Sequence, residues 1–275
     1  MSTKSKTCKF VIVVVLLGVV ACFCVSLAAD KKQEKELGIG DRFHYETSLT
    51  WRGALGDKLG DRPKKPAQYK SYPGSKKLVL PKPGHRGVAF EEAVLKRRSV
   101  RNYSKEAVSM AQLSQLLFAA QGVTGKTSGH SLRAAPSAGA LYPFEIYAVV
   151  NNVEDLAGGI YHYSVPDHAL EMVKAGDFSG QIRSAGLKQG MLGDSGVTFV
   201  LSAIFDRTRF KYGERGLRYV YIEAGHISQN ICLQAVSLGL GSVGVGAFLD
   251  EQVNKLIEVD DRTEAAVYLH AVGAL

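Results

Sequence analysis

Cysteines and metal-binding motifs are scarce in this 275-residue sequence. Three of its four cysteines (Cys8, Cys22 and Cys24) lie within the first 28 residues, so only Cys232 remains in the rest of the chain. One cysteine cannot form an intramolecular disulfide, and no CxxC or His/Cys cluster has the spacing of a zinc or haem site. We therefore expect neither a disulfide scaffold nor a metal centre.

The sequence also lacks the glycine motifs of the common nucleotide-binding folds. The run Gly-Leu-Gly-Ser-Val-Gly-Val-Gly at residues 239–246 follows a predicted helix instead of opening one after a strand. It is therefore neither a GxGxxG dinucleotide motif nor a GxxxxGK[ST] phosphate loop. This argues against a Rossmann or P-loop nucleotide site.

The excess of positive charge is modest. The formal net charge is +8, and it falls to +5 without residues 1–28, which hold three lysines and no acidic residue. Aromatic and basic residues do not alternate as they do in nucleic-acid-binding segments, so we expect no nucleic-acid partner. A surplus of this size is compatible with a site for one phosphate group.

Residues 1–29 have the pattern of a targeting segment. Three lysines precede an apolar run, residues 10–29, in which Ser26 is the only strongly polar residue. Cleavage after Ala28 would make this run a signal peptide, retention would make it a membrane anchor, and lipid modification of Cys22 is a third alternative. All three predict that the rest of the chain is extracytoplasmic, either exported or periplasmic, with membrane attachment through residues 10–29 left open.

The remaining chain divides by composition. Residues 30–87 are rich in lysine and proline and predict an extended arm. Residues 88–275 show regular periodicity, with helical stripes near residues 90–97, 109–122 and 220–238. Ser109 and Gln112 predict a capping box at the start of the second helix, and Gly239 predicts the end of the third. The apolar run 197–205 predicts a central strand. Strands are also expected at residues 144–150, 159–163, 169–173 and 265–272, which together predict an α+β domain.

Three segments carry candidate chemistry. Arg97, Arg98, Ser99 and Arg101 form a cluster that suits phosphate oxygens, although a basic turn is often only solvated surface. The small residues between Pro136 and Pro143 could admit a flat ligand or simply form a tight turn. Lys211 and Tyr212 offer proton-transfer groups or a solvated turn, because spacing alone does not show geometry.

These motifs occur in a characteristic order. Arg-Arg-Ser-x-Arg at residues 97–101 precedes Pro-Ser-Ala-Gly-Ala-Leu-Tyr-Pro at 136–143, Lys-Tyr-Gly-Glu-Arg-Gly at 211–216 and the glycine run at 239–246. This order resembles the SagB-type dehydrogenase branch of the flavin-dependent nitroreductase superfamily, which includes thiazole/oxazole oxidases. The resemblance covers about residues 41–273.

The resemblance implies a nitroreductase-like α+β fold with a mixed central sheet flanked by helices, and an intimate homodimer that binds FMN at its interface. By analogy, the FMN phosphate and ribityl end is held by Arg97, Arg98, Ser99 and Arg101. The isoalloxazine ring is lined by Pro136, Ser137, Ala138 and Gly139, and is closed over by Gly244, Val245 and Gly246. Lys211 and Tyr212 are the implied catalytic pair, which removes a proton while the flavin accepts a hydride.

The expected function is therefore two-electron hydride transfer through FMN, acting on an unidentified small-molecule or peptide substrate. The azole-forming members work in the cytoplasm, whereas residues 1–29 predict export. This mismatch keeps one alternative open, an exported or membrane-anchored flavin-binding or interaction protein without turnover.

Overall fold

The computed structural model describes residues 38–48, 62–84, 87–127 and 129–275, so the predicted leader of residues 1–29 lies outside the described residues. The chain divides into two compact units, residues 1–48 and residues 49–275. In the first unit the described residues form helix α2 (Ile39–Glu46), and the Thr47 hydroxyl donates to the Phe43 carbonyl in its last turn. No helix among the described residues is long and apolar enough to cross a membrane.

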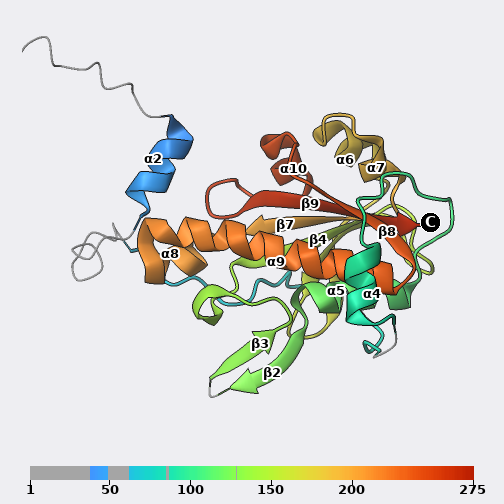
Figure 1. Ribbon diagram of the computed structural model, residues 1–275, viewed down its shortest axis with the longest axis horizontal. Coiled ribbons are helices and arrows are strands. Elements are labelled where there is room, and N and C mark those ends of the chain that lie inside the picture. Colours follow the sequence, from blue (N-terminus) through green and yellow to red (C-terminus); the bar gives the residue numbers. More distant parts are fainter. Residues whose placement is uncertain (1–37, 49–61, 85–86, 128) are drawn as a thin grey trace, which may run out of the picture. The chain divides into compact units, whose positions relative to one another are not determined.

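A seven-stranded sheet forms the centre of the second unit (Figure 1). Its strands are β1 (Lys77–Val79), β4 (Phe144–Val150), β5 (Gly159–Ser164), β6 (Ala169–Ala175), β7 (Val197–Ala203), β8 (Leu240–Val245) and β9 (Ala265–Ala274). Their order across the sheet is β1-β6-β5-β4-β7-β9-β8, and every ladder between these strands is antiparallel. The prediction of a mixed sheet is wrong for the described strands. Short connections join β4 to β5 and β5 to β6, and hairpins make neighbours antiparallel.

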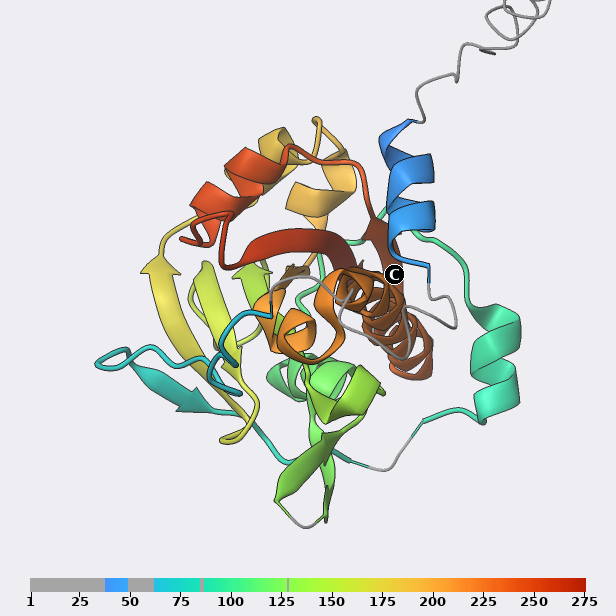
Figure 2. The ribbon, with the colours of Figure 1, turned by 90° about the vertical axis from the view of Figure 1, so that its left-hand side faces the viewer.

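Helices cover both faces of the sheet (Figure 1). The helices are α4 (Phe90–Lys96), α5 (Met110–Gln121), α6 (Ser179–Ala185), α7 (Gly190–Asp194), α8 (Asp206–Tyr212), α9 (Gly216–Ser237) and α10 (Asp250–Leu256). α5 and α9 contribute Leu113 and Val220 to one apolar core, while α6 and α10 contribute Ile182 and Val253 to the other. Figure 2 looks along α9 and shows it nearly end-on beside the strands.

The elements with strong local signals lie where the sequence predicts them. Ser109 and Gln112 form the expected capping box of α5, with Gln112 N donating to Ser109 Oγ at 3.2 Å and Ser109 N to Gln112 Oε1 at 2.8 Å. Gly239 follows the end of α9 with a φ of 71°, a value that glycine adopts without steric cost. The predicted central strand is β7, which pairs with β4 and β9 and is buried along its whole length.

The glycine run after α9 forms strand β8 at an edge of the sheet. A Cβ at Gly241 would lie 2.8 Å from Val100, and a Cβ at Gly244 would lie 2.6 Å from the Tyr268 hydroxyl oxygen. These glycines therefore do not form a turn. They let Val100 and Tyr268 pack directly against the backbone of β8. A hairpin of β2 (Val123–Thr127) and β3 (His130–Arg133) was not predicted, because it buries little apolar surface and has no strong period.

The predicted arm of residues 30–87 contains helix α2 and strand β1, and its last third contacts the sheet. Lys70 Nζ lies 2.6 Å from Glu264 Oε2, and the Tyr72 hydroxyl lies 2.9 Å from the Tyr147 hydroxyl. β1 then extends the sheet by pairing with β6. This part of the arm belongs to the second unit, while the domain boundaries at residues 29 and 87 stay predictions.

One buried arginine joins the arm, α8 and the segment that leads into β4. Arg207 Nη1 lies 2.6 Å from Glu145 Oε1 and donates to the Tyr142 carbonyl at 3.3 Å, while Nε donates to the Ala67 carbonyl at 2.7 Å. Burial alone would raise the pKa of the Glu145 carboxyl, but the hydrogen bond from His162 and the charge of Arg207 lower it to about 2. The Glu145 charge is therefore retained at any pH above this value.

The change Glu145→Gln should destabilise the protein by about 3–5 kcal/mol, because it leaves the Arg207 guanidinium buried without a counter-charge. The matched control Glu92→Gln removes an exposed partner of Lys96 and should change the unfolding free energy by less than ~1 kcal/mol. Denaturant titration at neutral pH measures both values. Since the folded pKa of Glu145 is depressed, its contribution should be complete above about pH 4.5 and should disappear as the pH falls toward 2. Equal effects of the two changes would contradict this assignment.

Candidate functional site

A cavity of about 430 Å³ lies between the end of α4, the middle of α9 and the edge of the sheet. Its lining residues are Arg97, Ser99, Tyr221, Ala224, Gly225, Ser228, Gln229, Cys232, Gly244, Val267 and Tyr268. Four elements or segments therefore meet at this cavity: the segment that follows α4, helix α9, and strands β8 and β9. Three of these residues, Arg97, Ser99 and Gly244, belong to the set that the sequence predicted.

Side chains alternate in direction along an extended backbone, so the side chains of Arg97 and Ser99 lie on the same side of this segment and both line the cavity. Ser99 pairs with Ser242 of β8 in a parallel bridge, and Val100 N donates to the Ser242 carbonyl at 3.0 Å. Residues two apart in such a segment face the same way. The Arg97 guanidinium makes no ion pair with the described residues, so its charge is available to a ligand in the cavity.

The other two residues of the basic cluster lie elsewhere. Arg98 is exposed, and its Nη1 donates to the carbonyls of Leu95 at 3.1 Å and Arg97 at 2.7 Å. Arg101 lines a second cavity of about 530 Å³, together with Tyr103 and Lys105. The four residues predicted to hold a phosphate are thus divided in this chain, two at the first cavity and two outside it.

Glycines leave room in the walls of the first cavity. A Cβ at Gly225 would meet no atom within 4 Å, so this position opens directly into the hollow. Gly244 lies against Tyr268, and Gly246 is exposed near the same ring. Val245, between them, buries its side chain in the core, so only its backbone could face a ligand. Among the described residues no cluster of three or more His, Cys, Asp or Glu could hold a metal ion.

The loop of residues 136–142 contacts the lysine and tyrosine that the sequence predicted as catalytic. A Cβ at Gly139 would lie 2.8 Å from Tyr212 Oη and 2.9 Å from Lys211 Nζ. Lys211 Nζ also lies 5.3 Å from the centre of the Tyr212 ring. The structure therefore brings the 136–142 loop and the Lys211–Tyr212 pair together at the end of α8.

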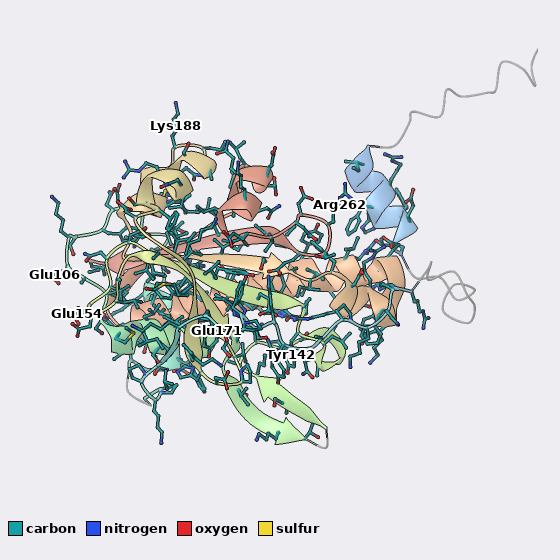
Figure 3. The ribbon with its side chains drawn as sticks, turned by 180° about the vertical axis from the view of Figure 1, so that it is seen from behind. Glu106, Tyr142, Glu154, Glu171, Lys188 and Arg262 are labelled. Carbon is teal, nitrogen blue, oxygen red and sulfur yellow. The ribbon has the colours of Figure 1, made fainter. Side chains whose placement is uncertain are left out.

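The backbone of the 136–142 loop is strained and firmly held. Ala140 and Tyr142 have φ values of 53° and 48°, which cost free energy for residues other than glycine. Ser137 Oγ accepts from Tyr142 N at 2.8 Å, and the Tyr142 hydroxyl accepts from Arg133 N at 3.0 Å. The Arg133 guanidinium lies 4.5 Å from the Tyr142 ring centre. Figure 3 shows Tyr142 near the base of the β2–β3 hairpin.

The cavity and the 136–142 loop occupy different places along α9. No residue of the loop and neither member of the Lys211–Tyr212 pair lines the cavity. Lys211 and Tyr212 precede α9, whereas the cavity residues on that helix begin at Tyr221 and end at Cys232. At about 1.5 Å of rise per residue, the centre of that stretch is well over 10 Å from the start of α9.

Sequence reasoning missed several residues of the cavity wall. Tyr268 and Val267 come from β9, and Ser228 and Gln229 from α9, where they look like ordinary members of a strand and a helix. The sequence held one signal for this wall. Gly225 lies inside a helix, where glycine lowers stability relative to alanine, so its presence there indicates a need for space, either for packing or for a ligand. The others required knowledge of which elements pack side by side.

An antiparallel sheet covered on both faces, with a cationic cavity at its edge, defines an α+β protein with a ligand site. Comparison with known proteins makes the class specific. The chain matches the Nitroreductase family over residues 94–274 and belongs to this family. Members of the family typically bind FMN and are typically dimeric.

Curated relatives include a nitroreductase-named protein and a microcin-processing protein. The chain is 37% identical over 174 residues to the nitroreductase-named protein MJ1384 of Methanocaldococcus jannaschii, which covers 63% of this chain and 86% of MJ1384. It is 32% identical over 174 residues to the microcin B17-processing protein McbC of Escherichia coli, covering 62% of this chain and 63% of McbC. Thus the chain spans less than two thirds of McbC. The predicted resemblance to the branch that contains such processing proteins is confirmed.

Solved structures show the same fold. A nitroreductase-named protein from Anabaena variabilis gives a TM-score of 0.69 at 26% identity, covering 84% of this chain and 46% of that chain. The McbBCD microcin synthetase complex of Escherichia coli, bound to truncated pro-MccB17, contains a chain with a TM-score of 0.55 at 23% identity. That match covers 94% of this chain and 92% of the other. The α+β nitroreductase-like fold is therefore confirmed.

The change Gly225→Ala tests whether the cavity admits FMN. Alanine should stabilise α9 by about 0.5–1 kcal/mol, yet its methyl group would project into the cavity and weaken FMN binding about tenfold. Gly180→Ala in α6 is the matched control, because a Cβ there also meets nothing within 4 Å but lies outside the cavity lining. Fluorescence titration and thermal unfolding measure the two effects. Unchanged FMN affinity in Gly225→Ala would argue that FMN binds elsewhere.

Proposed function

We propose that the protein is an FMN-dependent oxidoreductase that transfers two electrons as a hydride between flavin and an unidentified substrate. Family membership supports the reaction class, since nitroreductase-family proteins typically bind FMN. The observation that carries the proposal for this chain is the shared cavity of Arg97, Ser99 and Gly244. The SagB-type resemblance assigns these same residues to FMN.

The cavity residues fit the mononucleotide. Arg97 supplies a guanidinium without an ion pair among the described residues, and Ser99 supplies a hydroxyl on the same side. Charge-assisted hydrogen bonds of this kind are worth about 1.5–3 kcal/mol each, and Gly225 and Gly244 leave space for a bulky ligand beside them. When bound, FMN would supply the hydride chemistry.

Lys211 and Tyr212 are placed to handle a proton. Their Nζ and Oη atoms both approach Gly139 of the loop that the resemblance assigns to the flavin ring. Lys211 is exposed and Tyr212 is half-buried, so a substrate can reach them from solvent. We propose that this pair takes a proton from the substrate atom next to the one that gives its hydride to the flavin, so that a double bond forms between the two atoms.

A homodimer would bring the two parts of the site together. Large apolar side chains are exposed beside the cavity, with Phe90 and Leu95 of α4 at 66% and 72% exposure and Tyr221 and Ile222 of α9 at 54% and 56%. α4 and α9 pack against each other, so these residues form one apolar surface. We propose that a second copy covers this surface and brings its 136–142 loop over the cavity.

The substrate class and the compartment are also proposals. McbC and TfxB are named as processing proteins for microcin B17 and trifolitoxin, which supports a peptide substrate alongside a small molecule. The pattern of residues 1–29 supports action outside the cytoplasm. The azole-forming members of the branch work in the cytoplasm, whereas residues 1–29 predict export. This difference favours the alternative of an exported protein that binds FMN without turnover.

Arg97→Ala should weaken FMN binding by about 10- to 100-fold, because it removes a charge-assisted contact to the phosphate. Arg98→Ala provides the comparison, since that guanidinium bonds to its own backbone and should cause a much smaller loss. The visible spectrum of the purified protein, followed by FMN titration, measures the affinity. A protein that stays colourless after FMN addition would refute the proposed cofactor.

Lys211→Ala and Tyr212→Phe should each slow turnover by about 10²–10⁴-fold while FMN remains bound, since general-base help has this magnitude. Lys188→Ala is the control, because that exposed side chain points away from the rest of the unit (Figure 3). Stopped-flow mixing with reductants, nitroaromatic acceptors and peptides measures the rates. Turnover that neither change alters would exclude the catalytic role, and bound FMN without any turnover would favour the binding-only alternative.

A further inference from the structure

A buried histidine lies behind the wall of the cavity that Arg97 lines. His270 of β9 is 0% exposed, and it pairs across the sheet with Gly244 of β8, which lines the cavity. Side chains two apart on a strand point to the same face, and Tyr268 also lines the cavity. His270 is therefore on the face of the sheet that forms the cavity wall. The chemistry described above does not use this residue.

Two side chains of the cavity wall contact the His270 ring. Ser228 Oγ lies 2.8 Å from His270 Nδ1, and Cys232 Sγ lies 3.9 Å from Nε2. Ser228 and Cys232 are one turn apart on α9, so they share a face of the helix, and both line the cavity. The Ser228 hydroxyl makes no other hydrogen bond with the described residues. One imidazole ring thus supports two residues of the wall from behind.

The hydrogens available to these three side chains can be counted. Burial lowers the pKa of His270 to about 3, so at neutral pH the ring is uncharged and carries a hydrogen on only one nitrogen. Burial raises the pKa of the Cys232 thiol, so the thiol keeps its hydrogen. Sulfur is a weak acceptor, whereas the Ser228 oxygen is a strong one at 2.8 Å. A hydrogen on Nδ1 can therefore be donated to Ser228, which leaves the Nε2 lone pair to accept from the thiol.

This arrangement leaves the Ser228 hydroxyl hydrogen to be donated into the cavity. Its oxygen accepts from His270, and none of the described residues accepts its hydrogen. Phosphate oxygens are strong acceptors, and the Arg97 guanidinium on the same cavity has only donors. Ser228 would thus add a donor to the set that Arg97 and Ser99 present to an oxygen-rich ligand.

We propose that Ser228 is a further FMN-binding residue, which donates its hydroxyl hydrogen to an oxygen of FMN. In this proposal His270 is a positioning residue, which directs that hydrogen into the cavity by donating from Nδ1 to Ser228 Oγ. The inference rests on the proposed function, because it needs FMN in the cavity that Arg97 lines. Neither residue belongs to the segments that the resemblance assigns to FMN.

FMN titration of the full chain tests the contact. Ser228→Ala should weaken FMN binding about three- to tenfold, which is the effect expected for one lost hydrogen bond. Ser114→Ala is the matched control, because Ser114 of α5 also lies 2.8 Å from a histidine nitrogen, that of His168, but outside the cavity lining. The control should leave FMN affinity unchanged. Equal FMN affinity in Ser228→Ala and the unmodified protein would overturn the proposal.

Two changes at His270 separate positioning from packing. Asparagine places its side-chain amide near the position of Nδ1, whereas glutamine places it near that of Nε2. His270→Asn should therefore keep most of the FMN affinity, and His270→Gln should lose about as much as Ser228→Ala. Adding Ser228→Ala to His270→Gln should cause no further loss, because both changes remove the same contact. Losses that simply add would contradict the positioning role.

NMR of the FMN-free full chain, labelled with ¹⁵N-histidine, measures the ring hydrogen directly. The chemical shifts of the two ring nitrogens report which one carries it, and the His270 signals are identified by their change in Ser228→Ala. We expect the hydrogen on Nδ1, and a hydrogen on Nε2 would overturn the inference even if the His270 variants fail to fold. Since this measurement needs no FMN, a protein with the hydrogen on Nδ1 that binds no FMN would instead refute the proposed function.

Discussion

The buried guanidinium of Arg207 is the contact on which the described site depends. It joins Glu145 of β4, the Tyr142 carbonyl and the Ala67 carbonyl, and it belongs to the same short helix as Lys211 and Tyr212. One charged group thus fixes the position of Lys211 and Tyr212 relative to the strained loop. His162 of β5 forms a hydrogen bond with the Glu145 carboxylate, so two strands of the sheet hold the counter-charge of Arg207 in place.

The candidate site residues of this chain lie at two separate places along α9. The 136–142 loop is held at the start of α9, whereas Arg97, Ser99 and the glycines gather around its middle. The 136–142 loop contributes no residue to the cavity lining, and exposed apolar side chains of α4 and α9 adjoin the cavity. A dimer explains both features, since it would cover the apolar side chains and place a partner's loop over each cavity. This arrangement also agrees with the typical dimers of the family.

Local signals in the sequence were enough for much of the fold. The Ser109–Gln112 capping box, the apolar run Phe144–Val150 after Pro143 and Gly239 after α9 each act over a few residues and led to correct elements. The antiparallel pairing of strands distant in sequence and strand β8 were missed, because they depend on which distant segments lie side by side. The motifs predicted Arg97, Ser99 and Gly244, which line one cavity, but the outward turn of Arg98 depends on tertiary packing.

We propose that each FMN is bound between the Arg97 cavity of one subunit and the 136–142 loop of the other. Mixed dimers measure it directly, formed by co-expressing differently tagged subunits that carry either Arg97→Ala or Gly139→Leu. If the two parts come from different subunits, one site of each mixed dimer is intact and the other has both defects, so one FMN per dimer should be bound. Mixed dimers in which both sites bind FMN as weakly as in the two parent variants would show that each subunit builds its own site and would contradict the account.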